Sequence, residues 1–190
     1  MDYQTFPSPA AVALLSSKLR SVPDFPKPGI IFKDITPLLG DPQALQIALD
    51  LMAAPFIGHG VSHVVAMEAR GFIFGAAVAA KLNAGFVPVR KPGKLPAATD
   101  AVRYALEYGE SELHMHQGSL RPGAKVLVID DLLATGGTAA ATAELVRRQG
   151  GEVLAFIFAV ELDFLQGRKL LADKAGQGIP VYSLVHVDGE

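Results

Sequence analysis

The sequence predicts an α/β fold in which helices surround a parallel sheet. Half of the 190 residues are hydrophobic, and Gly, Ala and Val are plentiful, which suits such a fold. Short apolar runs alternate with longer stretches of helical period, and the run at 126–129 is typical of a strand buried on both faces. Because a chain of 190 residues suits one hydrophobic core of ordinary size, we expect residues 1–190 to form a single domain.

Composition and charge argue against several classes of function. The net charge of −2 argues against broad nucleic-acid binding, which needs a basic surface. The chain has no cysteine, so it can form neither a disulfide nor a thiolate zinc site. Residues 1–4 lack the basic start of a signal peptide, and no apolar run approaches the roughly 18 residues of a membrane span. We therefore expect a soluble, cytoplasmic protein without a nucleic-acid or membrane partner.

The first part of the chain predicts a helix, an extended segment and a second helix. Ser8 and Pro9 supply an N-cap and a first helical residue, and apolar residues follow at helical spacing to about residue 20. Residues 24–39 contain too many prolines for a helix and predict an extended arm. Asp41 and Pro42 begin the second helix, which we expect to end near residue 54.

The rest of the chain predicts strands that alternate with helices. Strands, recognised as short apolar or alternating runs, are expected at 61–67, 86–89, 112–117, 126–129, 151–160 and 181–185. Helices are expected at 72–82, 139–149 and 164–172, whereas residues 96–109 show no steady helical pattern. His114 and His116 share the polar face of their strand, but a metal site there would need a third ligand that the neighbouring sequence does not offer.

The stretch from 126 to 138 carries the main chemical signal. Asp130 and Asp131 follow its apolar run, where we expect the strand to end. The turn that leads into the next helix consists of Ala134, Thr135, Gly136, Gly137 and Thr138. Its two glycines let the backbone lie close to a ligand, and its free N–H groups can bind an anion. Ionised carboxylates only accept hydrogen bonds, so the two acids suit vicinal hydroxyls or a metal. A 5-phosphoribosyl group has both an anion and such hydroxyls.

This motif resembles the PRPP-binding signature of the type I phosphoribosyltransferase family, PRPP being 5-phosphoribosyl 1-pyrophosphate. The resemblance covers roughly residues 19–185 and implies a five-stranded parallel sheet flanked by helices, a small hood (20–40) and a mobile lid (95–115). It also implies that the acids hold the ribose and that residues 134–138 hold its 5′-phosphate. The alternative is an ordinary strand-to-helix turn with two glycines. Neither a Walker motif nor a dinucleotide fingerprint is present.

Two further loops match the pyrophosphate-binding loops of this family. Arg70 follows the strand at 61–67 and matches the family's arginine, whose guanidinium fork suits phosphate oxygens. Arg90, Lys91 and Lys94 follow the next strand, at an edge of the sheet where α/β proteins bind ligands. The family often has a non-proline cis peptide beside its arginine, and Glu68–Ala69 is the candidate bond. Solvated surface cations are the alternative for both loops.

The hood sequence resembles the adenine-binding segment of one branch of the family. Ile31, Phe32 and Lys33 match positions where main-chain groups read the edge of the base, and a backbone N–H and C=O fit the N1 and 6-amino edge of adenine. Phe32 can supply an apolar wall. Leu132 and Leu162 are the further candidates for contact with the base. The alternative is that Ile31 and Phe32 are ordinary core residues.

The sequence Tyr-Ala-Leu-Glu-Tyr-Gly at 104–109 resembles the tip of the family's lid. Glu107 matches the carboxylate proposed to protonate or orient the incoming base, and it is the candidate catalytic residue. Tyr108 matches its neighbour over the site and is a candidate for the pyrophosphate side. The alternative is a surface hairpin with an exposed glutamate.

The resemblance implies a pentosyl transfer in purine salvage, in which adenine and PRPP give AMP and pyrophosphate. Mg²⁺ is the implied cofactor, held mainly by PRPP and water without a direct protein ligand, and a homodimer is the implied assembly. One alternative is an enzyme of the same fold that uses xanthine, hypoxanthine, uracil or orotate. Another is a PRPP-sensing transcription regulator, which the short N-terminal segment and the net charge oppose.

Overall fold

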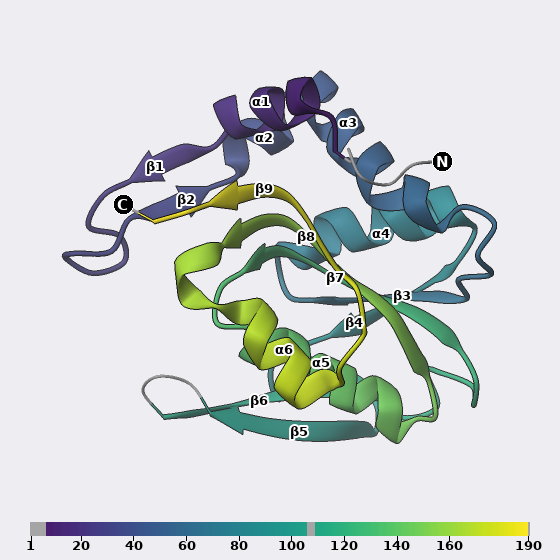
Figure 1. Ribbon diagram of the computed structural model, residues 1–190. Coiled ribbons are helices and arrows are strands. Elements are labelled where there is room, and N and C mark those ends of the chain that lie inside the picture. The colour runs from purple at the N-terminus through teal and green to yellow at the C-terminus, as the bar shows by residue number, and fades with distance from the viewer. Residues whose placement is uncertain (1–6, 106–108, 190) are drawn as a thin grey trace.

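The computed structural model describes residues 7–105 and 109–189 (Figure 1). Its centre is a parallel sheet of five strands in the order β4-β3-β7-β8-β9. The strands are β3 (His63–Met67), β4 (Gly85–Val89), β7 (Lys125–Leu133), β8 (Glu152–Leu162) and β9 (Val181–Val187). The five-stranded parallel sheet implied by the resemblance is thus confirmed.

The strand order reverses between β3 and β7. The chain places β4 on one side of β3, and then returns to add β7, β8 and β9 in succession on the other side. In open α/β sheets, ligands bind beyond the carboxyl ends of the strands at the point of such a reversal. The fold therefore directs attention to the loops that follow β3 and β7.

Helices cover both faces of the sheet (Figure 1). One face carries α1 (Pro9–Ser17), α2 (Thr36–Gly40), α3 (Pro42–Ala53) and α4 (Gly71–Leu82). The other face carries α5 (Gly137–Arg148), α6 (Gly167–Ala175) and the antiparallel pair β5 (Thr99–Ala105) and β6 (Glu110–His116). Short 3₁₀ turns lie at Ala54–Phe56 and Asp163–Leu165. No helix in the described ranges is long and apolar enough to cross a membrane.

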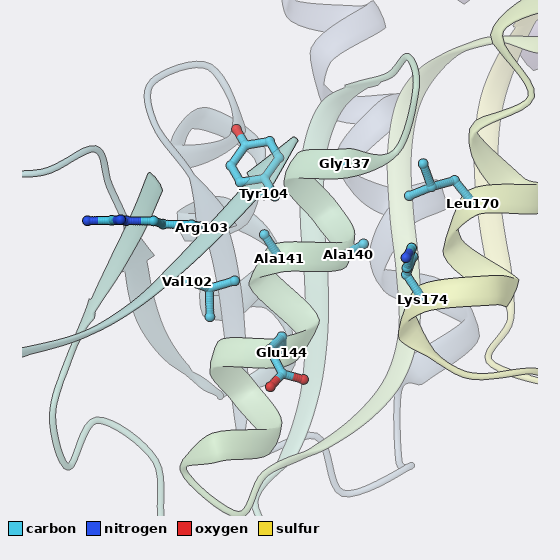
Figure 2. A pocket seen from close by; sticks show the side chains of 9 residues that line it. All are labelled: Val102, Arg103, Tyr104, Gly137, Ala140, Ala141, Glu144, Leu170 and Lys174. Atoms are coloured by element: carbon cyan, nitrogen blue, oxygen red, sulfur yellow. The ribbon is translucent and has the colours of Figure 1, made fainter. Parts of the chain in front are cut away.

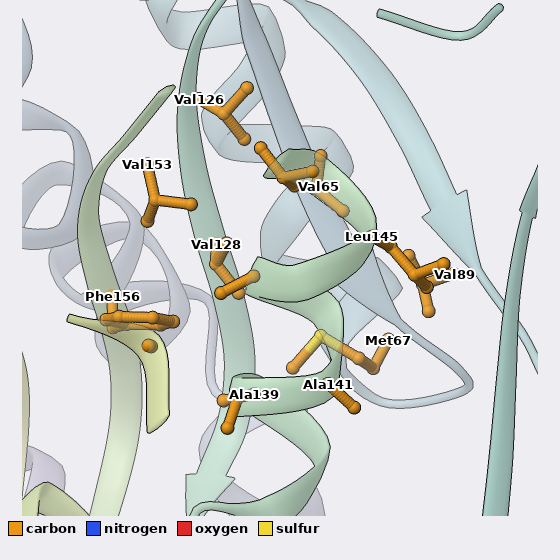
Figure 3. Packing of buried hydrophobic residues seen from close by; sticks show 14 of the residues in the cluster. Val65, Met67, Val89, Val126, Val128, Ala139, Ala141, Leu145, Val153 and Phe156 are labelled. Atoms are coloured by element: carbon orange, nitrogen blue, oxygen red, sulfur yellow. The ribbon is translucent and has the colours of Figure 1, made fainter. Parts of the chain in front are cut away.

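Strand β7 supplies side chains to both cores. Val126 and Val128 pack toward α5, where Figure 3 shows them beside Val65 and Phe156 from the neighbouring strands. Leu127 belongs to the opposite core, with α3 and α4. All of these residues are buried, which explains why the strand appears in the sequence as an unbroken apolar run.

The predicted starts of α1 and α3 are confirmed. The Ser8 hydroxyl accepts a hydrogen bond from Ala11 N–H, and the Asp41 carboxylate accepts bonds of 3.0 Å from the N–H groups of Gln43 and Ala44. These bonds satisfy N–H groups that have no acceptor inside their helices. Each helix therefore begins where its capping residue predicts.

The hood is more structured than an extended arm. Its strands β1 (Arg20–Val22) and β2 (Phe32–Asp34) pair antiparallel, and α2 follows them directly. The expectation that prolines prevent a helix throughout 24–39 was wrong, because Pro37 lies in the first turn of α2, where its missing N–H costs nothing. The Asp34 carboxylate accepts a bond from Thr36 N–H and pairs with Arg20, which lowers its pKa to about 2.

Two elements on the α5 side differ from the sequence prediction. Strand β5 was not predicted, although its partner β6 was, and Leu113 and Met115 of β6 are buried as the alternation required. Helix α6 begins three residues later than predicted, because a 3₁₀ turn precedes it and Gln166 takes a left-handed conformation with φ of 52°.

Candidate active site at the ends of β3 and β7

The paired acids lie within β7, not after it. The prediction that the strand ends before Asp130 was wrong, because pairing with β8 continues through Leu133, opposite Glu161. Asp131 is buried with 4% of its surface exposed, whereas Asp130 keeps part of its surface open. Asp130 Oδ1 accepts a hydrogen bond of 2.9 Å from Asp131 N–H. The strand thus fixes both carboxylates at the reversal point of the sheet.

The two carboxyl groups share one electrostatic environment. Burial raises the pKa of Asp130 well above its ordinary value, and the neighbouring Asp131 carboxylate raises it further. Burial also raises the pKa of Asp131, while the Arg70 guanidinium opposes that rise. Arg70 Nε lies 2.8 Å from Asp131 Oδ2 but does not direct its N–H at that atom, so the buried oxygen accepts no hydrogen bond from the described residues. Such an acceptor suits a ligand hydroxyl.

The loop after β7 forms a small cavity at the start of α5. Gly136 has φ of 85°, a left-handed conformation that Gly adopts without steric cost, and α5 begins at the next residue. The cavity measures about 70 Å³ and is lined by Asp130, Leu132, Leu133, Ala134, Thr135, Gly136, Thr138, Ala139 and Phe158. The helix start leaves N–H groups without intrahelical acceptors, so an anion can bind here.

Helix α6 supports this loop from behind. A Cβ atom on Gly136 would lie 2.7 Å from Gly167 O, and one on Gly167 would overlap the Ala134 carbonyl oxygen. Arg168 fixes the same end of α6, since its Nε lies 2.7 Å from Oε1 of the buried Glu161. Sequence reasoning missed Glu161, Gly167 and Arg168, because Gly167 meets the loop, and Glu161 and Arg168 fix α6, only through the tertiary fold.

Arg70 joins three of the predicted segments. Its guanidinium lies 5.2 Å from the centre of the Phe32 ring in the hood and beside Asp131 on β7. The Glu68–Ala69 peptide before it is cis, as the resemblance suggested. Gly71 brings the start of α4 so close to β7 that a Cβ there would lie 2.6 Å from Asp130 Oδ1. Hood, arginine loop and acid pair therefore form one site.

The basic loop after β4 is held by an acid that the sequence reading did not single out. The Glu68 carboxylate accepts 2.7 Å hydrogen bonds from Arg90 Nε and from Lys91 N–H, and Arg90 also donates to Lys94 O at 3.0 Å. Burial raises the pKa of Glu68, but the bonds from Lys91 and Arg90 outweigh it and lower the pKa overall. The signal that could have indicated Glu68 is its place directly before the arginine loop.

The candidate base-binding residues fall into two groups in the structure. Phe32 faces Arg70. Ile31, Lys33 and Leu162 line a separate cavity of about 340 Å³, together with Phe164 and other residues. Leu132 lines the small cavity beside the loop that follows β7. The structure thus brings Phe32 and Leu132 toward the acid-pair side, while the other three side chains line the separate cavity.

The lid candidates Glu107 and Tyr108 lie outside the described residues. The hairpin that leads to them is described, and backbone bonds between Arg90 and His114 join its strand β6 to the end of β4. Its strand β5 carries Tyr104, whose hydroxyl lies 3.2 Å from Thr138 Oγ1. Figure 2 shows Tyr104 beside Gly137, at the start of α5. The β5–β6 hairpin therefore reaches the start of α5, next to the loop that follows β7.

Comparisons with known proteins agree with this geometry. The family described as phosphoribosyl transferase domain matches residues 44–178. The adenine phosphoribosyltransferase of Sorangium cellulosum is 66% identical over 97% of this chain and 92% of its own, and that of Myxococcus xanthus is 58% identical over 82% and 85%.

Solved structures give the same result. The adenine phosphoribosyltransferase of Rhodothermus marinus superimposes with a TM-score of 0.88 at 48% identity, covering 94% of this chain and 99% of that one. The enzyme of Saccharomyces cerevisiae, complexed with an imino-altritol bisphosphate and adenine, gives 0.84 at 36% identity over 92% and 98%. The chain therefore belongs to the adenine phosphoribosyltransferase family.

Proposed function

We propose that this protein transfers the 5-phosphoribosyl group of PRPP to N9 of adenine, forming AMP and releasing pyrophosphate. The observation that carries the proposal is the position of a buried carboxylate oxygen on Asp131, which accepts no hydrogen bond from the described residues, three residues before a loop that begins at Ala134 and can bind an anion. Arg70 and Phe32 lie on the same side. The names of the relatives supply the base, adenine.

The ribose 5-phosphate part is assigned to β7 and its loop. Asp130 and Asp131 accept hydrogen bonds from the ribose 2′ and 3′ hydroxyls, because ionised carboxylates are acceptors only. The 5′-phosphate lies in the 70 Å³ cavity against the start of α5, held by residues 134–138. The diol and the phosphate are thereby fixed by one rigid strand and the helix that follows it.

The pyrophosphate is assigned to the cationic loops after β3 and β4. Arg70 is already beside the acid pair, and Glu68 orients Arg90 and the backbone of Lys91. Lys94 is held in the same loop, because Arg90 donates a hydrogen bond to its carbonyl oxygen. These cations stabilise the negative charge that develops on the leaving group. Tyr108 in the lid is the further candidate on this side.

Adenine is assigned to the space between the hood and β7. Phe32 and Leu132 supply apolar surfaces, and the backbone at Ile31 and Lys33 supplies the donor and acceptor for the base edge. N9 attacks C1′ as pyrophosphate departs, with positive charge on the sugar ring, so no covalent enzyme intermediate is needed. Glu107 orients the base, and its carboxylate accepts the proton that N9 loses when the bond to C1′ forms. Catalysis then comes from positioning and electrostatics, inside a lid that excludes water.

Mg²⁺ is the proposed cofactor, held by PRPP and water without a direct protein ligand; when bound, it would neutralise negative charge on the pyrophosphate. The donor set fits this role, because Mg²⁺ prefers oxygen ligands and retains its waters, and Asp130 offers carboxylate oxygens beside the cavity that follows β7. In the described ranges, Glu161, Asp163 and His186 also lie within reach of one ion, but Arg168 already pairs with Glu161. A single domain, a homodimer and a cytoplasmic location complete the proposal.

The decisive measurement is AMP formation from adenine and PRPP, with and without EDTA. We expect adenine to be used, hypoxanthine, xanthine, uracil and orotate to be refused, and EDTA to abolish turnover until Mg²⁺ is restored. Activity with a 6-oxopurine and none with adenine would overturn the base assignment. Full activity in EDTA would overturn the Mg²⁺ assignment and leave the base assignment intact.

Replacing Glu68 tests the pyrophosphate assignment. Glu68→Ala removes the acceptor for both Arg90 Nε and Lys91 N–H, so the basic loop loses its fixed geometry. We expect pyrophosphate to bind about tenfold more weakly, the effect of one to two hydrogen bonds, when measured by calorimetry. Asp50→Ala, which removes a distant acid paired with Lys81, is the matched control and should bind as wild type does. Unchanged or tighter binding by Glu68→Ala would contradict the assignment.

A further inference from the structure

One hydrogen bond connects the base of the lid to the loop assigned to the 5′-phosphate. Tyr104, near the end of β5, places its hydroxyl 3.2 Å from Oγ1 of Thr138, in the first turn of α5. The two residues are 34 positions apart in the sequence. Thr138 also lines the small cavity after β7. The bond therefore joins two parts of the chain that act on different parts of the substrate.

We propose that Tyr104 is a positioning residue, which orients the Thr138 hydroxyl toward the 5′-phosphate and couples phosphate binding to the base of the lid. The inference rests on the proposed phosphate site. It concerns a residue that makes no contact with the reacting atoms and acts only through Thr138.

The hydrogen-bonding capacity of a threonine hydroxyl supports this role. The group has one O–H donor and can accept through its lone pairs. Within a helix, a Thr hydroxyl commonly donates to a carbonyl of the preceding turn, as Thr142 does to Thr138 O at 2.9 Å. When Tyr104 donates to Thr138 Oγ1, the Thr138 O–H is left to donate to a phosphate oxygen. An anion at the end of this chain polarises and strengthens both bonds.

The surroundings of Tyr104 hold its ring in place. The ring is half-buried against the core, and it lines a cavity of about 420 Å³ with Val102, Ala140 and Ala141 (Figure 2). In the described part of the chain, the Thr138 hydroxyl is the one hydrogen-bond partner of the Tyr104 hydroxyl. Because the ring is packed and its hydroxyl is committed, Tyr104 can fix the position of Thr138.

Strand β5 lies along α5 and transmits the effect to the lid. Its other end is fixed to the C-terminal part of the helix, where Gln149 Nε2 donates to Asp100 Oδ2 at 2.8 Å and Arg148 donates to Ala101 O at 3.0 Å. Tyr104 makes the corresponding contact at the N-terminal end of the helix. A phosphate that strengthens this contact therefore stabilises the last residues of β5, immediately before the lid tip.

The test is a double-mutant cycle on ribose 5-phosphate binding, measured by calorimetry. Tyr104→Phe removes only the hydroxyl, so we expect binding to weaken about three- to tenfold, the effect of one hydrogen bond. In a Thr138→Val background, the same change should have no further effect. Pyrophosphate, which is assigned to other loops, should bind to Tyr104→Phe as it binds to wild type.

Tyr182→Phe is the matched control. Its ring packs at 5.5 Å from Phe56 in the opposite core, so loss of its hydroxyl should leave ribose 5-phosphate binding unchanged. Wild-type affinity in Tyr104→Phe, or an equal loss with and without the Thr138 hydroxyl, would overturn the coupling while the phosphate site stands. Failure of the wild-type protein itself to bind ribose 5-phosphate would overturn the phosphate site, and this inference with it.

Discussion

Asp130→Asn is expected to unfold at a higher temperature than the wild type at pH 8, and to bind ribose 5-phosphate about ten- to a hundredfold more weakly. This loss of affinity is the size expected when hydrogen bonds from the ribose hydroxyls to a charged carboxylate are weakened. The gain in stability arises because the substitution removes one of two neighbouring like charges, and this one is also disfavoured by loss of solvation. Asn keeps an oxygen that can accept the bond from Asp131 N–H, so the strand need not rearrange.

The pH dependence follows from the raised pKa of Asp130. The folded protein binds this proton more tightly than the unfolded chain, so the contribution of Asp130 to stability is fully present below its unfolded pKa. That contribution is lost as the pH rises through the raised pKa of the folded state. The amide of the Asn side chain does not titrate. The free energy of unfolding of the variant should therefore exceed that of the wild type by a margin that grows as the pH rises, and the two should differ little at acid pH.

Scanning calorimetry from pH 4 to pH 8 measures this difference, beside ribose 5-phosphate binding at pH 8. Asp50→Asn is the control of opposite sign, because the bond from Lys81 lowers the pKa of Asp50 and its charge is favourable in the folded state. A thermal unfolding midpoint of Asp130→Asn below that of the wild type at pH 8 would contradict the electrostatic argument. Wild-type affinity would contradict the assignment of Asp130 to the ribose.

The sheet could be predicted from the sequence because its strands are buried on both faces. A strand such as β7 needs apolar residues at successive positions, and a run of that kind is visible without any knowledge of its neighbours. Helices α1 and α3 were equally clear from Ser8 and Asp41, whose caps are local contacts. Where a local residue pattern and the fold demand the same structure, sequence reasoning succeeds.

The errors arose where tertiary contacts decide the structure. Strand β5 contains Asp100 and Arg103, and its pattern becomes that of a strand only through pairing with β6. Strand β7 extends past its apolar run because β8 continues beside it, so the acid pair is held in the sheet. Gln166 takes a left-handed conformation usually left to Gly, Asn or Asp, which displaced the predicted start of α6.

The same distinction applies to the site. Candidate substrate-binding residues could be proposed from the sequence, because a motif of acids, small residues and cations has a chemical meaning by itself. The supporting residues could not, because Glu68, Tyr104 and Arg168 act through partners 22, 34 and 7 positions away. Glu68 and Tyr104 lie in or beside segments that the sequence marks, but nothing in those segments shows which distant group each side chain contacts.

Gly136→Ala is expected to lower kcat/KM for PRPP about a hundredfold, the effect of displacing a binding group by roughly 1 Å. Two costs combine at this position. An L-residue with φ of 85° is strained by about 1–2 kcal/mol. The new Cβ would also lie 2.7 Å from Gly167 O, so the loop and α6 must separate. The loop would then no longer present its N–H groups to the 5′-phosphate in the fixed geometry that binding requires.

Two other glycines separate these costs. Gly178 has φ of 87°, and no atom of the described residues lies within 4 Å of its missing Cβ, so Gly178→Ala carries the backbone strain without the contact. Gly167 has no left-handed conformation, but its Cβ would overlap the Ala134 carbonyl oxygen, so Gly167→Ala carries the contact without the strain. We therefore expect Gly178→Ala to lose some thermal stability and keep its KM for PRPP, whereas Gly167→Ala raises that KM.

The three variants together decide whether contact with α6 holds the phosphate loop in place. If it does, the KM for PRPP rises in Gly136→Ala and Gly167→Ala, and the KM for adenine changes little, because the hood lies on another part of the site. If Gly178→Ala raised the KM for PRPP as much as the other two, general destabilisation would explain all three effects. A wild-type KM in Gly167→Ala would show that the loop keeps its shape without α6, and that the backbone conformation of Gly136 alone forms the anion site.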